Sequence, residues 1–139
     1  MPHTSSTTFR VRYAETDQMG VVYHANYFVW FEMGRVEFLR QLGFEYKQME
    51  VVDDCHLPVV EATCRYKSPA RYDELLTVET RLSALRSTVV RFAYRLLRPT
   101  EEGPQLLAEA ETTHVAVNGK METRPLPEKY AAPLRSALA

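Results

Sequence analysis

The residues best suited to chemistry lie in one short run, YAETDQMGVVYHANY, which spans residues 13–27. Asp17 supplies a carboxylate, and His24 supplies an imidazole seven positions later. An apolar pattern of helical period begins directly after them, which places both side chains on a loop that enters a helix N-terminus. The unpaired N–H groups and positive dipole of such a terminus suit it to polarising a carbonyl oxygen. A carboxylate that faces the same spot can act as a base or a nucleophile.

The same residue types also fit a loop with no catalytic role. Gly20 allows a positive φ or the close approach of a ligand to the backbone. Asp17 suits an Asx turn, Asn26 suits a helix N-cap, and His24 suits an exposed, solvated position. The residue types alone therefore leave a catalytic loop and a structural loop both open.

The element behind this loop is predicted to be a long helix over residues 26–42, ending at Gly43. Its main apolar stripe consists of Tyr27, Phe31, Gly34, Phe38 and Leu42. Further apolar residues widen this stripe, so the helix is expected to be covered on most of its sides.

Strands are predicted from alternating patterns on both sides of that helix. A first strand is expected at 8–14, and four more are expected at 60–67, 76–82, 89–97 and 107–117. Residues 44–55 show no clear pattern, and 128–138 fit a terminal helix. Short connectors favour antiparallel neighbours. This order predicts a single α+β domain over residues 1–139, with a five-stranded antiparallel sheet wrapped around the helix.

Composition bounds the class of protein. The chain has 139 residues, 45% hydrophobic and 25% charged, which are ordinary values for one globular domain. A net charge of −1 argues against bulk nucleic-acid binding. No uncharged apolar run approaches the ~18 residues of a membrane span, and the first residues lack a signal peptide's apolar core. Cys55 and Cys64 form no metal motif and are interpreted as small buried side chains. A cytoplasmic protein without a metal is expected.

Charge is unevenly distributed along the chain. Residues 65–98 contain eight basic and three acidic side chains within a nearly neutral protein. Such a segment suits a phosphorylated ligand, and it equally suits a solvated face of the sheet. Within it, Arg86 and Ser87 occupy a short turn between two predicted strands, where a guanidinium and a hydroxyl can hold a phosphate.

The motif Y-x-E-T-D-x-x-G-V-V-Y-H-x-N-Y, followed by W-F-E-x-x-R-x-E-F-L, resembles the hotdog-fold acyl-CoA thioesterases of the 4-hydroxybenzoyl-CoA thioesterase type. It looks most like the branch whose bacterial members accompany the Tol–Pal system. The resemblance covers nearly the whole chain, because the order of strands after the helix also matches. It implies a hotdog fold and hydrolysis of acyl-CoA with no bound cofactor, coenzyme A being part of the substrate.

The resemblance also implies roles for individual residues. Asp17 is the expected catalytic carboxylate, the backbone N–H of His24 is the expected carbonyl donor, and the side chains of His24 and Tyr13 are expected to assist. The expected substrate-binding residues are Gly20, Tyr23, Asn26, Tyr27, Arg86 and Ser87. Arg86 and Ser87 are the first candidates for the coenzyme A phosphates, with Arg65 and Lys67 in reserve.

The chain is expected to form an oligomer, and two other functions remain open. A bare sheet edge is a liability, and family members form sites between two subunits, so a dimer or a dimer of dimers is expected. One alternative function is a hotdog dehydratase that acts on hydroxyacyl thioesters. Another is a non-catalytic acyl-CoA binder or interaction partner, which would keep ligand affinity without releasing thiol.

Overall fold

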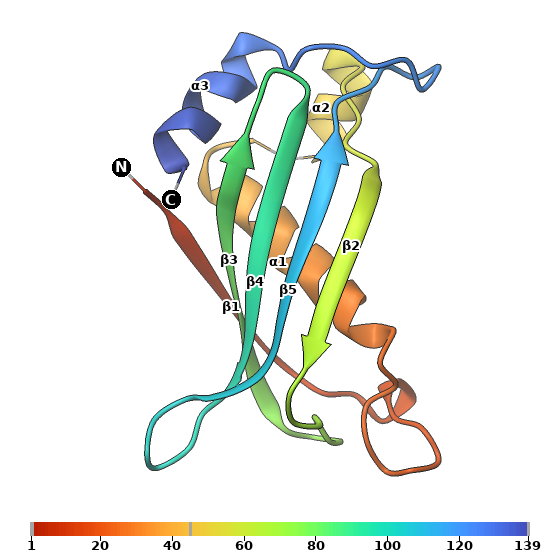
Figure 1. The fold of residues 1–139 in the computed structure, drawn as a ribbon, viewed down its shortest axis with the longest axis vertical. Helices are drawn as coiled ribbons and strands as arrows, with labels where there is room; N and C mark the ends of the chain where they lie inside the picture. Colours follow the sequence, from red (N-terminus) through yellow and green to blue (C-terminus); the bar gives the residue numbers. More distant parts are fainter. Residues whose placement is uncertain (1, 45, 139) are drawn as a thin grey trace.

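The computed structural model describes residues 2–44 and 46–138, in which five strands and three α-helices are placed (Figure 1). The strands are β1 (Thr4–Arg10), β2 (Val59–Tyr66), β3 (Leu75–Leu85), β4 (Val89–Arg98) and β5 (Gln105–Val115). The helices are α1 (Asn26–Gln41), α2 (Tyr46–Asp53) and α3 (Glu128–Ala137). The strands form one antiparallel sheet in the order β1-β3-β4-β5-β2. This confirms the predicted α+β hotdog architecture.

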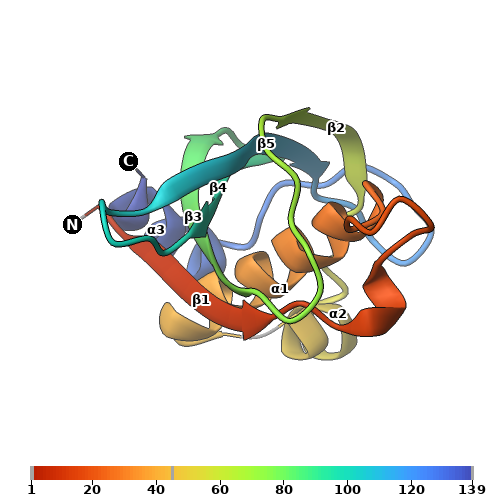
Figure 2. The same ribbon diagram turned by 90° about the horizontal axis from the view of Figure 1, so that it is seen from below.

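The sheet curves around α1, as seen from below in Figure 2. Trp30, Phe31, Phe38 and Leu39 on this helix are almost completely buried against the sheet. Gly34 lies where α1 crosses β3, and a Cβ at this position would be 2.8 Å from Val78 Cγ1. The absence of a side chain at Gly34 therefore lets the two backbones approach, which brings the start of α1 close to the sheet.

The first strand is displaced from its predicted range of 8–14 and spans Thr4–Arg10. Thr4 to Thr8 are all Ser or Thr and give no apolar alternation, yet they pair along β3. The chain then leaves the sheet and forms a short 3₁₀ turn at Tyr13–Glu15. Val11 is buried, but Tyr13 points outward and is 77% exposed.

The alternation in the second strand places Val60, Ala62, Cys64 and Tyr66 on one side, and this side is largely exposed in the single chain. Only Cys64 is partly covered, because β2 is an edge strand that pairs with β5 alone. Val60 remains 59% exposed. The outer edge of the sheet thus presents backbone hydrogen-bonding groups beside apolar side chains.

Two other elements complete the fold. The stretch without a clear pattern contains α2, whose Met49 is fully buried. The predicted terminal helix is present as α3, with Pro133 inside it. Cys55 is buried and Cys64 half-buried, and both are free thiols. No helix within residues 2–44 and 46–138 is long and apolar enough to cross a membrane.

Candidate active site

Asp17 lies in a tight turn that its own side chain stabilises. Its N–H donates to the Val21 carbonyl at 2.9 Å, and its carbonyl accepts the Gly20 N–H at 3.0 Å. Its Oδ1 accepts the Met19 N–H at 2.8 Å. Gly20 has a φ of 81°, a conformation that favours glycine. The Asx turn considered above is therefore present, and it fixes the direction of the carboxylate while leaving Oδ2 without a hydrogen-bond partner among the described residues.

A cavity of about 320 Å³ opens beside this turn. Three of the predicted site residues line it, namely Asp17, His24 and Tyr27. The opposite wall comes from the end of β2 and the chain that follows it, and it contributes Tyr66, Lys67, Ser68 and Pro69. The structure thus brings a carboxylate, the start of α1 and a cationic side chain to one hollow. Lys67 was only a reserve candidate in the sequence.

The start of α1 leaves two backbone donors free among the described residues, the N–H groups of His24 and Ala25, and of these two residues His24 lines the cavity. Asn26 N–H donates to the Tyr23 carbonyl at 2.9 Å, and Tyr27 N–H donates to the His24 carbonyl at 3.3 Å. Among the described residues, the His24 N–H has no acceptor. A free backbone N–H at a helix N-terminus is suited to receiving a carbonyl oxygen that gains negative charge.

Glu15 anchors the loop to the helix, a role that the sequence analysis missed. Glu15 is 5% exposed, and its carboxylate accepts the Trp30 indole N–H and the Arg12 N–H, each at 2.8 Å. Burial opposes its ionisation, but these hydrogen bonds outweigh burial and lower the pKa of Glu15. Its carbonyl accepts the Asn26 Nδ2–H at 2.9 Å. The side chain of Asn26 is therefore engaged in holding the loop.

The remaining predicted residues of the loop lie at its margin. The Tyr13 ring packs edge-on against Tyr72, with 5.5 Å between ring centroids, and it does not line the cavity. The Tyr23 ring is half-exposed and lies 4.6 Å from the His24 ring. Tyr27 is buried, and its hydroxyl accepts the Ala70 N–H at 3.2 Å. Of these aromatic residues, only Tyr27 lines the cavity.

Arg86 and Ser87 lie far from Asp17 within one chain. They form the turn between β3 and β4 and line a separate cavity of about 460 Å³ beside α3. This turn and the Asp17 loop are at opposite ends of the sheet (Figure 1). A single chain therefore does not bring these two groups of predicted residues together.

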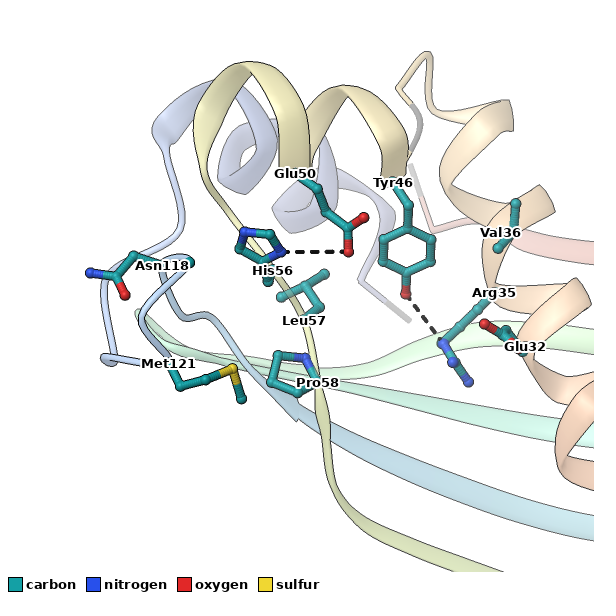
Figure 3. Close-up of a pocket in the computed structure, with 11 residues that line it drawn as sticks. Glu32, Arg35, Val36, Tyr46, Glu50, His56, Leu57, Pro58, Asn118 and Met121 are labelled. Carbon is teal, nitrogen blue, oxygen red and sulfur yellow. Dashed lines mark hydrogen bonds and ion pairs between the residues drawn. The ribbon is translucent and has the colours of Figure 1, made fainter.

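A further cavity of about 460 Å³ lies between α1, α2 and the chain entering β2 (Figure 3). Arg35, buried to 8% exposure, points from α1 toward Tyr46, and its Nε–H donates to the Tyr46 hydroxyl at 3.2 Å. Its Nη1–H donates to the Tyr94 hydroxyl, also at 3.2 Å. The Tyr94 hydroxyl lies 2.6 Å from Thr112 Oγ1, which lies 2.8 Å from His114 Nε2. This network is a polar part of the core and includes none of the predicted catalytic residues.

Within residues 2–44 and 46–138, no cluster of three or more His, Cys, Asp or Glu side chains is placed to bind a metal ion. The chemistry available in the cavity beside Asp17 is thus that of a carboxylate, an imidazole and a backbone donor.

Comparison with known proteins places the chain in a family. Residues 11–134 match the model of the thioesterase-like superfamily. The chain is 36% identical over 124 residues to the acyl-CoA thioester hydrolase YbgC of Escherichia coli O157:H7, covering 88% of this chain and 90% of that protein. Two crystal structures are similar: protein TT1821 of Thermus thermophilus (TM-score 0.89, 39% identity, 99% of both chains) and the DHNA-CoA thioesterase of Staphylococcus aureus (TM-score 0.85, 30% identity, 96% of this chain and 87% of that one). With a match over most of its length and the hotdog fold in common, the chain belongs to the thioesterase-like superfamily.

Proposed function

We propose that the protein hydrolyses the thioester bond of acyl-CoA to give a free acid and coenzyme A. The observation that carries this proposal is the meeting of the Asp17 carboxylate and the unpaired His24 N–H at one cavity. The similarity to a named acyl-CoA thioester hydrolase supports the same reaction. The proposed reaction uses no metal and no bound cofactor. Coenzyme A takes part only as a portion of the substrate.

In the proposed mechanism, the thioester carbonyl oxygen accepts the His24 N–H. Negative charge develops on this oxygen as the tetrahedral centre forms, and one preoriented donor is worth about 2.7–4 kcal/mol. Asp17 then either attacks the carbonyl carbon to form a mixed anhydride, which water cleaves, or removes a proton from an attacking water. The C–S bond breaks, and the thiolate leaves and takes up a proton. A thiol pKa of about 8.5, as for cysteine, makes it a good leaving group.

Other residues of the loop support this step. The His24 imidazole orients Asp17 or the water, and Tyr13 assists from the outer rim of the loop. Gly20 allows the tight turn that holds Asp17, Tyr27 flanks the acyl group from the wall of the cavity, and Tyr23 contributes from the margin beside the His24 ring. Asn26 contributes by holding the loop through the Glu15 carbonyl.

Coenzyme A binding is proposed to involve two copies of the chain. Lys67 lies at the Asp17 cavity, where it can meet a phosphate. Arg86 and Ser87, at the other end of the sheet, can serve the same site only from a second subunit. The free edge of β2 favours such pairing, because an unpaired strand with exposed Val59 and Val60 is a template for another strand. We therefore propose a homodimer or a dimer of dimers.

The branch of the family and the cellular location of the protein are also proposed. Membership of the branch that accompanies the Tol–Pal system remains a prediction from the sequence motif. Two free thiols suit a reducing compartment, which supports a cytoplasmic location. The competing functions are a dehydratase that acts on hydroxyacyl thioesters and an acyl-CoA binder without turnover.

The test is thiol release from a panel of acyl-CoAs by wild type and Asp17→Asn. We expect kcat to fall by about two decades or more, with binding of a non-hydrolysable thioether analogue nearly unchanged, because a transition-state interaction is lost. Asp73→Asn is the matched control, since Asp73 is exposed and outside the cavity.

Three outcomes would count against the proposal. Wild-type turnover in a correctly folded Asp17→Asn protein would remove Asp17 from the mechanism. Binding of the analogue without thiol release from any acyl-CoA would favour a binder. Loss of water from a hydroxyacyl-CoA with the thioester intact would favour a dehydratase.

A further inference from the structure

Tyr66 joins the end of β2 to the first turn of α1. Its hydroxyl donates to the His24 carbonyl at 3.0 Å. Its ring packs edge-on against the Tyr27 ring at 4.9 Å and the His24 ring at 6.2 Å. Tyr66 also lines the Asp17 cavity. It thus touches, from another element, the residue that lines the cavity and whose N–H has no acceptor among the described residues.

The position of this contact matters because a trans peptide unit is planar, with its C=O and N–H pointing in opposite directions. The His24 N–H shares its plane with the Tyr23 carbonyl, which is fixed by the Asn26 N–H at 2.9 Å. The following plane contains the His24 carbonyl, which is fixed by the Tyr66 hydroxyl. Two successive peptide planes are therefore tethered, and His24 between them has little freedom to rotate.

Only the second tether depends on a side chain from outside the helix. The first belongs to the start of α1 itself, and the His24 carbonyl has one further partner there, the Tyr27 N–H, at the longer distance of 3.3 Å. Removing the Tyr66 hydroxyl would therefore leave the helix formed but would loosen the His24 backbone at the mouth of the cavity.

We propose that Tyr66 is a positioning residue for thioester hydrolysis, whose hydroxyl holds the His24 backbone so that its N–H points at the substrate carbonyl oxygen. The inference rests on the proposed function and adds to it a residue that acts through His24. A preoriented donor needs no reorganisation when charge develops, and this advantage falls as the donor becomes mobile.

The protonation state of the Tyr66 hydroxyl agrees with this role. Burial raises the pKa of Tyr66 to about 12, with Cys64 contributing in the same direction. The group therefore stays protonated across the physiological range and keeps its proton for the His24 carbonyl. Its contribution should not vary with pH between 6 and 9, which separates it from a residue that moves protons in the reaction.

Tyr66→Phe removes the hydroxyl and keeps the ring. We expect kcat for acyl-CoA to fall about tenfold, the scale of one lost hydrogen bond that acts in the transition state, with KM changed less than twofold. The shape of the kcat–pH profile and the thermal midpoint should stay as in wild type. Tyr72→Phe is the matched control, because Tyr72 is exposed and, among the described residues, its ring contacts only that of Tyr13.

A second measurement does not depend on activity. The amide ¹⁵N resonances of His24 and Ala25 should shift or broaden in Tyr66→Phe, while amides in the centre of the sheet stay unchanged. If Tyr66→Phe releases thiol at the wild-type rate, or leaves the His24 resonance unmoved, the role of Tyr66 is refuted and the proposed function is not. A fall in kcat matched by loss of thermal stability would make Tyr66 a structural anchor. Absence of thiol release from the wild type would instead refute the proposed function and the inference with it.

Discussion

The imidazole of His114 is enclosed on β5, with both of its ring nitrogens engaged. Nδ1 lies 2.9 Å from the Leu57 carbonyl, and Nε2 lies 2.8 Å from Thr112 Oγ1. Burial lowers the pKa of His114 to about 4, although the bond to Leu57 acts in the opposite direction. The folded protein therefore holds a neutral imidazole at neutral pH, as a polar link within the core.

This depressed pKa predicts how stability changes with acid. An unfolded histidine has a pKa of about 6.5, so below that value the unfolded chain binds the proton more readily than the folded one. The contribution of His114 is complete above pH 6.5 and is lost as pH falls toward 4, to the extent of about 3 kcal/mol. Urea unfolding of wild type and His114→Gln at pH 7 and pH 4.5 measures the difference. An equal acid sensitivity in both proteins would contradict the prediction.

At the residue scale, the sequence was informative where chemistry depends on a local motif. Asp17 and His24 stand in one short run, and the structure places both at one cavity. Glu15 and Tyr66 were missed because their roles come from partners far along the chain. The indole of Trp30 and the carbonyl of His24 meet them only after folding. Periodicity and residue type carry no signal for such pairs.

The elements show how sensitive the site is to helix placement. α1 crosses β3 at Gly34, where the space for a side chain is already filled by Val78 and the fully buried Thr80. Because His24 stands at the N-terminal end of this helix and Asp17 lies on the loop before it, a displacement at Gly34 would move the His24 N–H relative to the Asp17 carboxylate.

Gly34→Ala tests this close approach. Alanine favours a helix by about 1 kcal/mol over glycine, but overpacking in a core costs about 1–3 kcal/mol, occasionally more. We expect overpacking to outweigh the gain in helix propensity, with a net loss of stability of up to about 2 kcal/mol in urea unfolding. Met33→Ala, at the neighbouring exposed position, should change stability by less than about 0.5 kcal/mol. A Gly34→Ala protein as stable as wild type would show that β3 can shift to make room for the methyl group at little cost in free energy.

The type and order of the elements were predictable where an apolar pattern follows one face, although β3 extends to Leu85 and β5 begins and ends two residues before its predicted range of 107–117. The helix over 26–42 and the strands that became β3 to β5 meet this condition, since their alternate residues enter the core. β1 begins in a run of Ser and Thr with little apolar contrast, and α2 buries only Met49. β2 has the expected alternation, but its apolar side is uncovered in one chain.

At the scale of the whole molecule, the free edge of β2 and the distant Arg86 point to the same arrangement. A second subunit paired along β2 would cover Val60 and supply basic residues that one chain cannot place near its own Asp17. The proposed site is thereby linked to the oligomer state.

Val60→Lys tests this link, because a charged side chain on an edge strand opposes pairing. We expect a smaller species than wild type in sedimentation at micromolar concentration. The KM for acyl-CoA should rise, with less change for a truncated thioester that lacks the nucleotide. Val51→Lys, on exposed α2, is the control. A wild-type protein that is monomeric and fully active would overturn the proposed arrangement.

The order of strands in the sheet also bears on how the chain is made. β3, β4 and β5 follow one another and pair as neighbours, whereas β2 precedes them and pairs only with β5. During synthesis at about 5–20 residues per second, β2 waits roughly 2–10 s for the whole of its partner to be translated. Throughout that interval the nascent chain carries Val59 and Val60 on a strand with no neighbour on either side. The ribosome-bound chain is therefore most open to chaperones, and to aggregation, before β5 is complete.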